Sequence, residues 1–157
     1  MSAVRVRLDA ERWHFQHGPI DLVLAADGAA DAIELAWARF RTVLDELVAE
    51  LGVLRRALSP WTQASGAVAQ RMVTACRPHA PAFITPMAAV AGAVADEVLA
   101  AMLPAAPRRA YVNNGGDIAL HLAAGTSYRV GLVADIARHG HGLALDGQFE
   151  VTHALPV

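Results

Sequence analysis

Residues 112–118, "VNNGGDI", place two amides, two glycines and a carboxylate in a row between apolar residues. Neighbouring glycines at 115 and 116 allow backbone conformations that other residues avoid, so successive N–H groups can converge on one anion. Asp117 would then be placed to hold a sugar hydroxyl or a metal, with Asn114 on the other side of the glycines. The alternative is turn chemistry between two strands. Spacing alone favours the turn.

A second candidate is "AAVAGAVAD", residues 88–96, in which Gly92 and Asp96 lie one helical turn apart on the same face. Packing alone explains Gly92, because small residues let a neighbour approach the helix backbone. A carboxylate in so apolar a helix needs a partner unless it marks the solvent face. We expect Asp96 and Asp117 to line one pocket from opposite sides.

The elements that must position these residues follow from the apolar pattern. Period-two or continuous apolar runs predict two N-terminal strands joined as a hairpin, and a second group of strands follows Arg109. The N-terminal strands cover 4–8 and 19–26, and the later ones cover 109–112, 117–122, 128–135, 142–146 and 149–155. Strands, then helices, then strands favour an α+β fold with a layered antiparallel sheet and packed helices.

Three helices are expected between the two groups of strands, over 30–56, 64–77 and 86–103. Apolar residues recur at spacings of three and four in the first. Thr85 is placed to cap the third, with Pro86 in its first turn. The three tryptophans are interpreted as packing residues.

The composition limits the classes of function. The chain has 157 residues, enough for a single domain over 1–157, with 55% hydrophobic and 18% charged residues. A net charge of -2 with scattered basic residues predicts no nucleic-acid partner. Asp96 and Glu97 in the most apolar run argue against a membrane span, and no membrane partner is expected. Cys76, the only cysteine, is interpreted as a buried thiol and favours a cytoplasmic location.

The seven histidines raise the question of a metal site. His139 and His141, in "RHGHG", would share a face if the segment were extended, but two imidazoles make only half a site. A loop with solvated histidines is the preferred interpretation, and no metal ligand is assigned. His121 alternates with the apolar face of its strand and could border a pocket.

Together, "PMAAVAGAVAD" and "VNNGGDI" resemble motifs of the ApbE-like superfamily, the FAD-dependent protein flavin (FMN) transferases, above all its uncharacterised bacterial and archaeal branch. "RWHFQHGPIDLVLAADG" also fits that branch. The resemblance implies a T-fold-related flavin transferase fold and a nucleotide or flavin ligand, FAD or FMN, with Mg in the complete protein. Carried over residue by residue, it implies cofactor binding at one set of positions: Gly92, Asp96, Asn114, Gly115, Gly116 and Asp117.

Two departures from the family pattern bear on catalysis. The transferases carry a lysine before the helix glycine, where this chain has Ala91. The family chains also continue past Val157 to further metal ligands, so the sequence is interpreted as the N-terminal portion of a longer chain, inactive alone. No catalytic residue is assigned.

Three functions remain open. The first is flavin or nucleotide binding with metal-dependent FMN transfer from FAD in the complete protein. The second is a non-catalytic nucleotide-binding or accessory protein, for example in sulfur or homocysteine metabolism. The third is a structural homo-oligomer. The apolar composition further predicts exposed surface, covered either by another copy of the chain or by the missing C-terminal segment.

Overall fold

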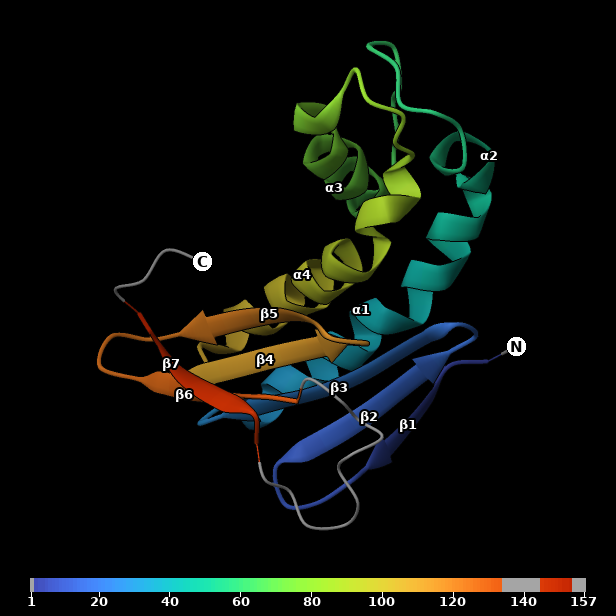
Figure 1. The fold of residues 1–157 in the computed structure, drawn as a ribbon. Coiled ribbons are helices and arrows are strands. Elements are labelled where there is room, and N and C mark those ends of the chain that lie inside the picture. The colour runs from blue at the N-terminus through green and yellow to red at the C-terminus, as the bar shows by residue number, and fades with distance from the viewer. Residues whose placement is uncertain (1, 134–144, 154–157) are drawn as a thin grey trace. The chain divides into compact units, whose positions relative to one another are not determined.

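The computed structural model describes residues 2–133 and 145–153, and the chain divides into two compact units, residues 1–121 and 122–157. The expected α+β class is confirmed, with antiparallel strands and packed helices (Figure 1). Most of the expected strand over 142–146, together with His139 and His141, lies outside the described residues.

A five-stranded sheet forms the base of the first unit, in the order β1-β2-β3-β4-β5. Its strands are β1 (Val4–Arg7), β2 (Arg12–His17), β3 (Ile20–Asp27), β4 (Arg109–Asn114) and β5 (Asp117–Leu122). β2 pairs antiparallel with both β1 and β3, and β3 pairs antiparallel with β4. All the helices of the unit follow β3, so its partner β4 is contributed by the chain that returns after them.

β2 corrects the expected N-terminal hairpin, because it lies between the two strands that were expected to pair directly. Its sequence, "RWHFQH", is rich in polar and basic residues and was not recognised as a strand. Phe15 and His17 are buried, whereas the alternate residues Arg12 and Gln16 are exposed. Burial of one face is therefore enough to form a strand whose other face is exposed to solvent.

The helices agree with the expected positions, but each is shorter or divided. The expected helix over 30–56 is α1 (Ala30–Ala49) followed by the short α2 (Leu51–Leu54), and the second is α3 (Ala67–Cys76). The third starts as a 3-10 turn, η2 (Pro86–Ala89), and continues as α4 (Val90–Met102). Thr85 is at the N-cap with Pro86 in the first turn, yet its side chain makes no capping hydrogen bond. Two further 3-10 turns are η1 (Arg77–His79) and η3 (Leu103–Ala105).

The core lies between the sheet and helices α1 and α4, which cover one face of it (Figure 1). Phe15 of β2 contacts Phe40 and Trp37 of α1, with ring centroids 5.5 and 5.1 Å apart. Val98 of α4 is fully buried in the same cluster. Trp13 and Trp37 pack against this core, as expected, but Trp61 is 87% exposed, so its interpretation as a packing residue was wrong.

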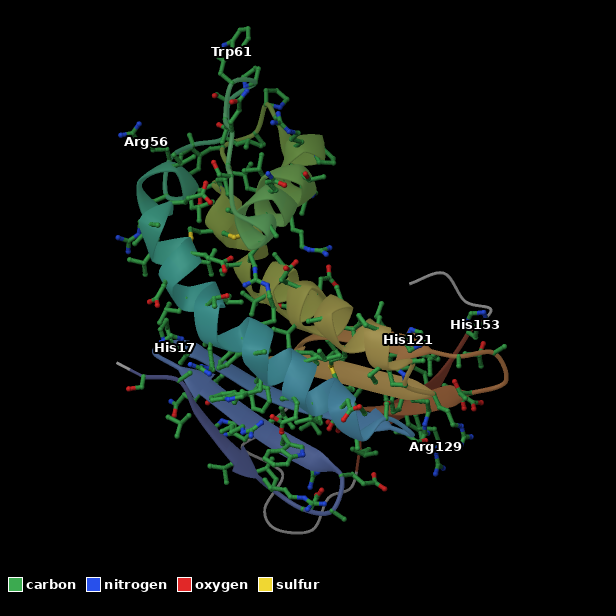
Figure 2. The ribbon with its side chains drawn as sticks, turned by 180° about the vertical axis from the view of Figure 1, so that it is seen from behind. His17, Arg56, Trp61, His121, Arg129 and His153 are labelled. Carbon is green, nitrogen blue, oxygen red and sulfur yellow. The ribbon has the colours of Figure 1, made fainter. Side chains whose placement is uncertain are left out.

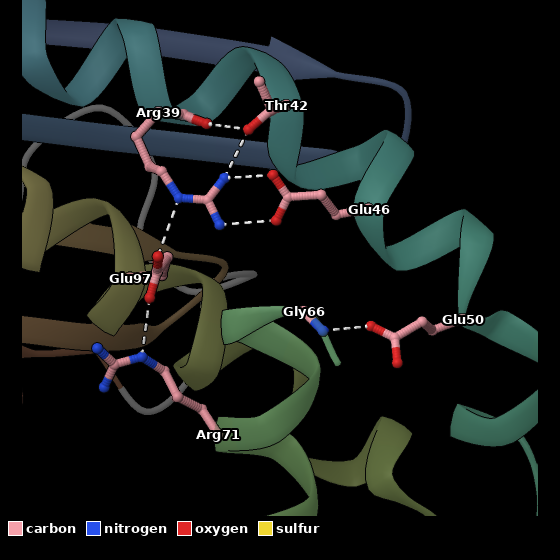
Figure 3. Close-up of polar contacts among 7 residues, drawn as sticks. All are labelled: Arg39, Thr42, Glu46, Glu50, Gly66, Arg71 and Glu97. Atoms are coloured by element: carbon pink, nitrogen blue, oxygen red, sulfur yellow. Dashed lines mark hydrogen bonds and ion pairs between the residues drawn. The ribbon is translucent and has the colours of Figure 1, made fainter. Parts of the chain in front are cut away.

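A network of charged side chains joins α1, α3 and α4 (Figure 3). Arg39 of α1 donates to both carboxylate oxygens of Glu46, at 2.7 and 2.8 Å, and its Nε donates to Glu97 of α4 at 2.9 Å. Arg71 of α3 donates to the other oxygen of Glu97 at 3.0 Å. Burial opposes ionisation of Glu97, but the hydrogen bonds from Arg39 and Arg71 outweigh it and lower its pKa. Glu97 therefore stays charged and connects the three helices.

Glu50, the residue at which α1 ends, also holds the start of α3. Its carboxylate accepts hydrogen bonds from the backbone N–H groups of Ser65 and Gly66, at 2.7 and 2.6 Å (Figure 3 shows the second). A carboxylate at this position satisfies free donors and complements the helix dipole. A Cβ on Gly66 would lie 2.8 Å from Glu50 Oε1, so any larger residue would push the carboxylate away.

The segment Pro86–Ala105 is long and apolar enough to cross a membrane by length and composition alone. Six of the residues in α4 are buried, and all of them belong to the protein core. They are Ala93, Val94, Ala95, Val98, Leu99 and Met102. The segment is therefore described as the core helix of a globular domain.

The second unit contains a two-stranded antiparallel sheet formed by β6 (Ser127–Leu132) and β7 (Gly147–Thr152). Tyr128 pairs with Val151, and Ser127 donates a hydrogen bond to the Glu150 carboxylate. These strands start within one or two residues of the expected ones.

We expect Glu97→Gln to lower the free energy of unfolding by about 1–3 kcal/mol, because it leaves two arginines poorly compensated. The folded-state pKa values of Glu97 and Glu46 are lowered. Their contribution is therefore present above about pH 4.5, near the unfolded value, and is lost as the pH falls through the folded-state values. The difference between wild type and variant should shrink on acidification, as measured by urea unfolding at several pH values.

Glu34→Gln is the matched control, because Glu34 pairs with Arg5 at the surface and its side chain is 61% exposed, against 13% for Glu97. Its effect should stay within about 0.5 kcal/mol. Equal effects of the two substitutions would show that the network around Glu97 does not hold the helices together.

Candidate functional site

The two glycines of the "NNGGD" segment form the loop of the hairpin that joins β4 to β5. Gly115 and Gly116 have φ of +62° and +110°, which fits a two-residue hairpin turn and favours glycine at both positions. The Gly116 N–H donates to Asn113 Oδ1 at 2.9 Å. One N–H of the anticipated anion site is thus already used inside the turn, and of the two interpretations the geometry matches the turn.

Asn114 connects the hairpin to the small-residue helix. Its Nδ2 donates to the backbone oxygen of Ala91, 3.1 Å away, at the start of α4. The two sequence motifs, 23 residues apart in the chain, therefore meet at this hydrogen bond. Ala91 and Asn114 are half-buried and line the same cavity.

This cavity has a volume of about 400 Å³ and lies among α1, α2, the start of α4 and the β2–β3 turn. Most of its lining side chains are aliphatic. They are Pro19, Ile20, Leu44, Leu47, Val48, Leu51, Leu54, Met87, Val90, Ala91 and Val94. Volume and lining are those of a small-molecule site.

Two polar side chains complete the lining of the apolar cavity, namely Asn114 and Arg55. Arg55 follows α2 and is exposed, so it places a permanent positive charge at the rim. An amide and a guanidinium can orient a ligand and neutralise an anionic group, but neither exchanges protons readily at neutral pH. The arrangement suits binding better than acid–base chemistry.

Asp96 lies elsewhere, in a polar groove between α3 and α4 with a volume of about 510 Å³. The groove is lined by Ala67, Gln70, Arg71, Thr74, Ala75, Asp96 and Glu97. Asp96 is exposed, and a Cβ added to Gly92 would meet no atom within 4 Å. Close packing therefore does not explain Gly92, contrary to the sequence interpretation.

Asp117 is exposed at the first residue of β5 and, like Asp96, is not among the residues that line the apolar cavity. Of the six predicted site residues, only Asn114 lines that cavity. Whether the other five bind a ligand stays a prediction. Arg55 and the aliphatic lining were missed, because they come from three separate stretches of the chain, 19–20, 44–55 and 87–94, that only the fold brings together.

The metal and histidine interpretations add little to the site. Within residues 2–133 and 145–153, no three histidine, cysteine or acidic side chains gather as metal ligands would. His121 is half-buried on β5 and Cys76 is buried on α3. Burial raises the pKa of the Cys76 thiol, which makes it a poor nucleophile.

Residues 5–157 match the model of a protein family described as AbpE bacteria. The chain belongs to this family. A comparison with functionally curated proteins gives no match. The family match covers both compact units, so it concerns the whole fold rather than one motif.

This match corrects the resemblance drawn from the sequence. The family is not one of flavin (FMN) transferases, so the assignment to the ApbE-like superfamily was wrong. The residues that carried it have local structural explanations: a core helix with small residues, and a two-residue hairpin turn. Both features recur in unrelated folds. The T-fold-related assignment depended on the same resemblance.

The two motif glycines should respond oppositely to substitution. Gly92→Ala should raise the free energy of unfolding by about 0.5 kcal/mol, because alanine favours a helix and has room. Gly116→Val should lower it by about 1–3 kcal/mol, because a β-branched residue is strained at positive φ. Thermal unfolding of both variants tests this, and a destabilising Gly92→Ala would show that the helix needs the glycine for packing after all.

Proposed function

We propose that this chain is a non-catalytic small-molecule-binding protein whose ligand occupies the apolar cavity. The observation that carries the proposal is the cavity itself, an aliphatic chamber of about 400 Å³ with one amide and one rim arginine as its polar side chains. It favours the accessory role over transfer chemistry. Flavin transfer and Mg belonged to the corrected resemblance and are left out of the proposal.

The ligand class follows from the lining. A flat or branched apolar moiety fits the aliphatic walls, a hydrogen-bonding edge suits Asn114, and an anionic group suits Arg55 at the rim. FMN has these three parts: the dimethylbenzene side of its ring system is apolar, the pyrimidine edge forms hydrogen bonds, and the phosphate ends the ribityl chain. FMN is therefore the first nucleotide to test, ahead of the larger FAD. A cytoplasmic location, favoured by the single buried thiol of Cys76, is part of the proposal.

FMN should bind more tightly than riboflavin, by about fivefold, because only FMN offers a phosphate to Arg55. Arg55→Gln should remove this difference and leave riboflavin binding unchanged. The matched control is Arg56→Gln, since Arg56 is an exposed neighbour that does not line the cavity. Flavin fluorescence titrations of the three proteins with the two ligands measure all six affinities.

Filling the cavity gives an independent test in the same assay. Ala91→Leu adds bulk at the wall and should weaken flavin binding at least about tenfold, whereas Ala88→Leu adds the same bulk at an exposed position. Circular dichroism checks that both variants fold. If wild type and Ala91→Leu bind FMN equally, or if neither binds, the cavity is not a flavin site.

We also propose that the chain forms a homo-oligomer through the β1 edge of its sheet. Within residues 2–133 and 145–153, β1 pairs only with β2, and its Val4 and Val6, with the adjoining Leu8, are about half exposed. An apolar edge strand readily pairs with another chain. Light scattering should give at least a dimer, and Val6→Lys should shift it toward monomer; a monomeric wild type would contradict the proposal.

A further inference from the structure

One stretch of the first unit carries several positive charges and no acidic residue of its own, although Glu50, just before it, contacts the backbone of Ser65 and Gly66. Residues 51–95 contain Arg55, Arg56, Arg71 and Arg77 but no aspartate or glutamate, although the whole chain has a net charge of -2. Two loops of this region, residues 55–66 and 77–85, are together called the basic tip. The acidic residues of the chain all lie outside residues 51–95.

Two aromatic side chains protrude from the basic tip. Trp61, in the first loop, is 87% exposed, and Phe83, in the second, is 85% exposed. Figure 2 shows Trp61 at the far end of the helices, with Arg56 on the same end of the unit. Exposure on this scale leaves almost the whole apolar surface of both rings in water.

The two loops are held together, so their aromatic residues are presented from one support. The Leu58 N–H donates to the backbone oxygen of Ile84 at 2.8 Å. Arg77 of the second loop donates to the backbone oxygen of Thr62 in the first, at 3.0 Å. Arg71 is neutralised by Glu97, but the salt bridges within the described residues do not include Arg55 or Arg56.

We propose that the basic tip docks on an anionic lipid surface. Trp61 and Phe83 enter the boundary between headgroups and acyl chains, and Arg56 and Arg77 lie at the level of the lipid phosphates. Tryptophan favours this boundary, and basic residues are attracted to the negative cytoplasmic leaflet. Docking on an anionic lipid surface explains both the charge of the basic tip and the exposure of its aromatic rings.

The size of the apolar contact favours lipid over a protein partner. An aromatic side chain buries about 150–250 Å², so two supply about 300–500 Å². A stable protein interface needs about 800 Å² from each partner. A lipid surface needs no such matching patch, because the free energies of shallow apolar insertion and of charge attraction both contribute to binding. This proposal replaces the expectation of no membrane partner. It depends on Arg56, Trp61, Arg77 and Phe83, none of which lines the cavity, although Arg55 at the cavity rim belongs to the same loop.

The test uses the full chain and vesicles of phosphatidylcholine with and without phosphatidylserine, with binding measured by co-sedimentation. We expect binding only to the vesicles that contain phosphatidylserine, weakened by salt, with a blue shift of tryptophan emission. Trp61→Ala and Phe83→Ala should each weaken binding about tenfold or more. Arg56→Gln should weaken it about fivefold.

Two controls on α1 match these changes away from the basic tip. Leu35→Ala removes an exposed apolar side chain and Arg41→Gln removes an exposed charge, and both should leave binding unchanged. Absence of vesicle binding would overturn the proposal and point to an acidic protein partner. Equal binding to vesicles without phosphatidylserine would overturn it too, as would equal losses in the tip variants and the controls.

Discussion

The ion pairs centred on Glu97 are the interaction on which the helical layer depends. One carboxylate with 13% side-chain exposure accepts hydrogen bonds from Arg39 of α1 and Arg71 of α3. α4 also packs six buried side chains, mostly alanine and valine, into the core beside these helices. Separating Glu97 from its arginines would leave a partly buried charge without a partner, which is costly. The ion pairs therefore favour one arrangement of the three helices. α1 and α4, which this network joins, both contribute walls of the apolar cavity.

The end of α1 has a second consequence for the cavity. At Glu50 the backbone leaves the helical conformation, so α2 starts as a separate turn and directs Leu51, Leu54 and Arg55 to the cavity. The side chain of the same residue holds the start of α3 through Gly66. One residue thus shapes the opening of the cavity and secures the helix that carries Arg71. Opposite, the Asn114–Ala91 hydrogen bond fixes the hairpin to α4.

Local patterns predicted much of the fold, because the spacing of apolar residues and the turn residues that bound an element both lie within one segment of the chain. These patterns predicted α1, α3, α4 and the β4–β5 turn. β2 was missed because polar residues on its solvent-exposed face make the alternation of apolar residues hard to recognise. The cavity could not be predicted, because its walls come from segments far apart in the chain. Trp61 was misinterpreted because composition cannot distinguish a packed tryptophan from an exposed one. The family resemblance was wrong for a related reason. Motifs of glycine and alanine reflect local turns and helices that occur in many unrelated families.

The central claim is that the apolar cavity is a ligand site, and methyl resonances test it most directly. A titration with FMN, followed by carbon–proton correlation spectra, should shift the methyl groups of Leu44, Leu54 and Val94, which line the cavity. The methyl groups of Val4 and Val6 on the β1 edge, and of Thr74 in the polar groove, should not move. Shifts confined to Thr74 would place the ligand in the groove with Asp96. Such a result, or spectra that do not change at all, would contradict the account.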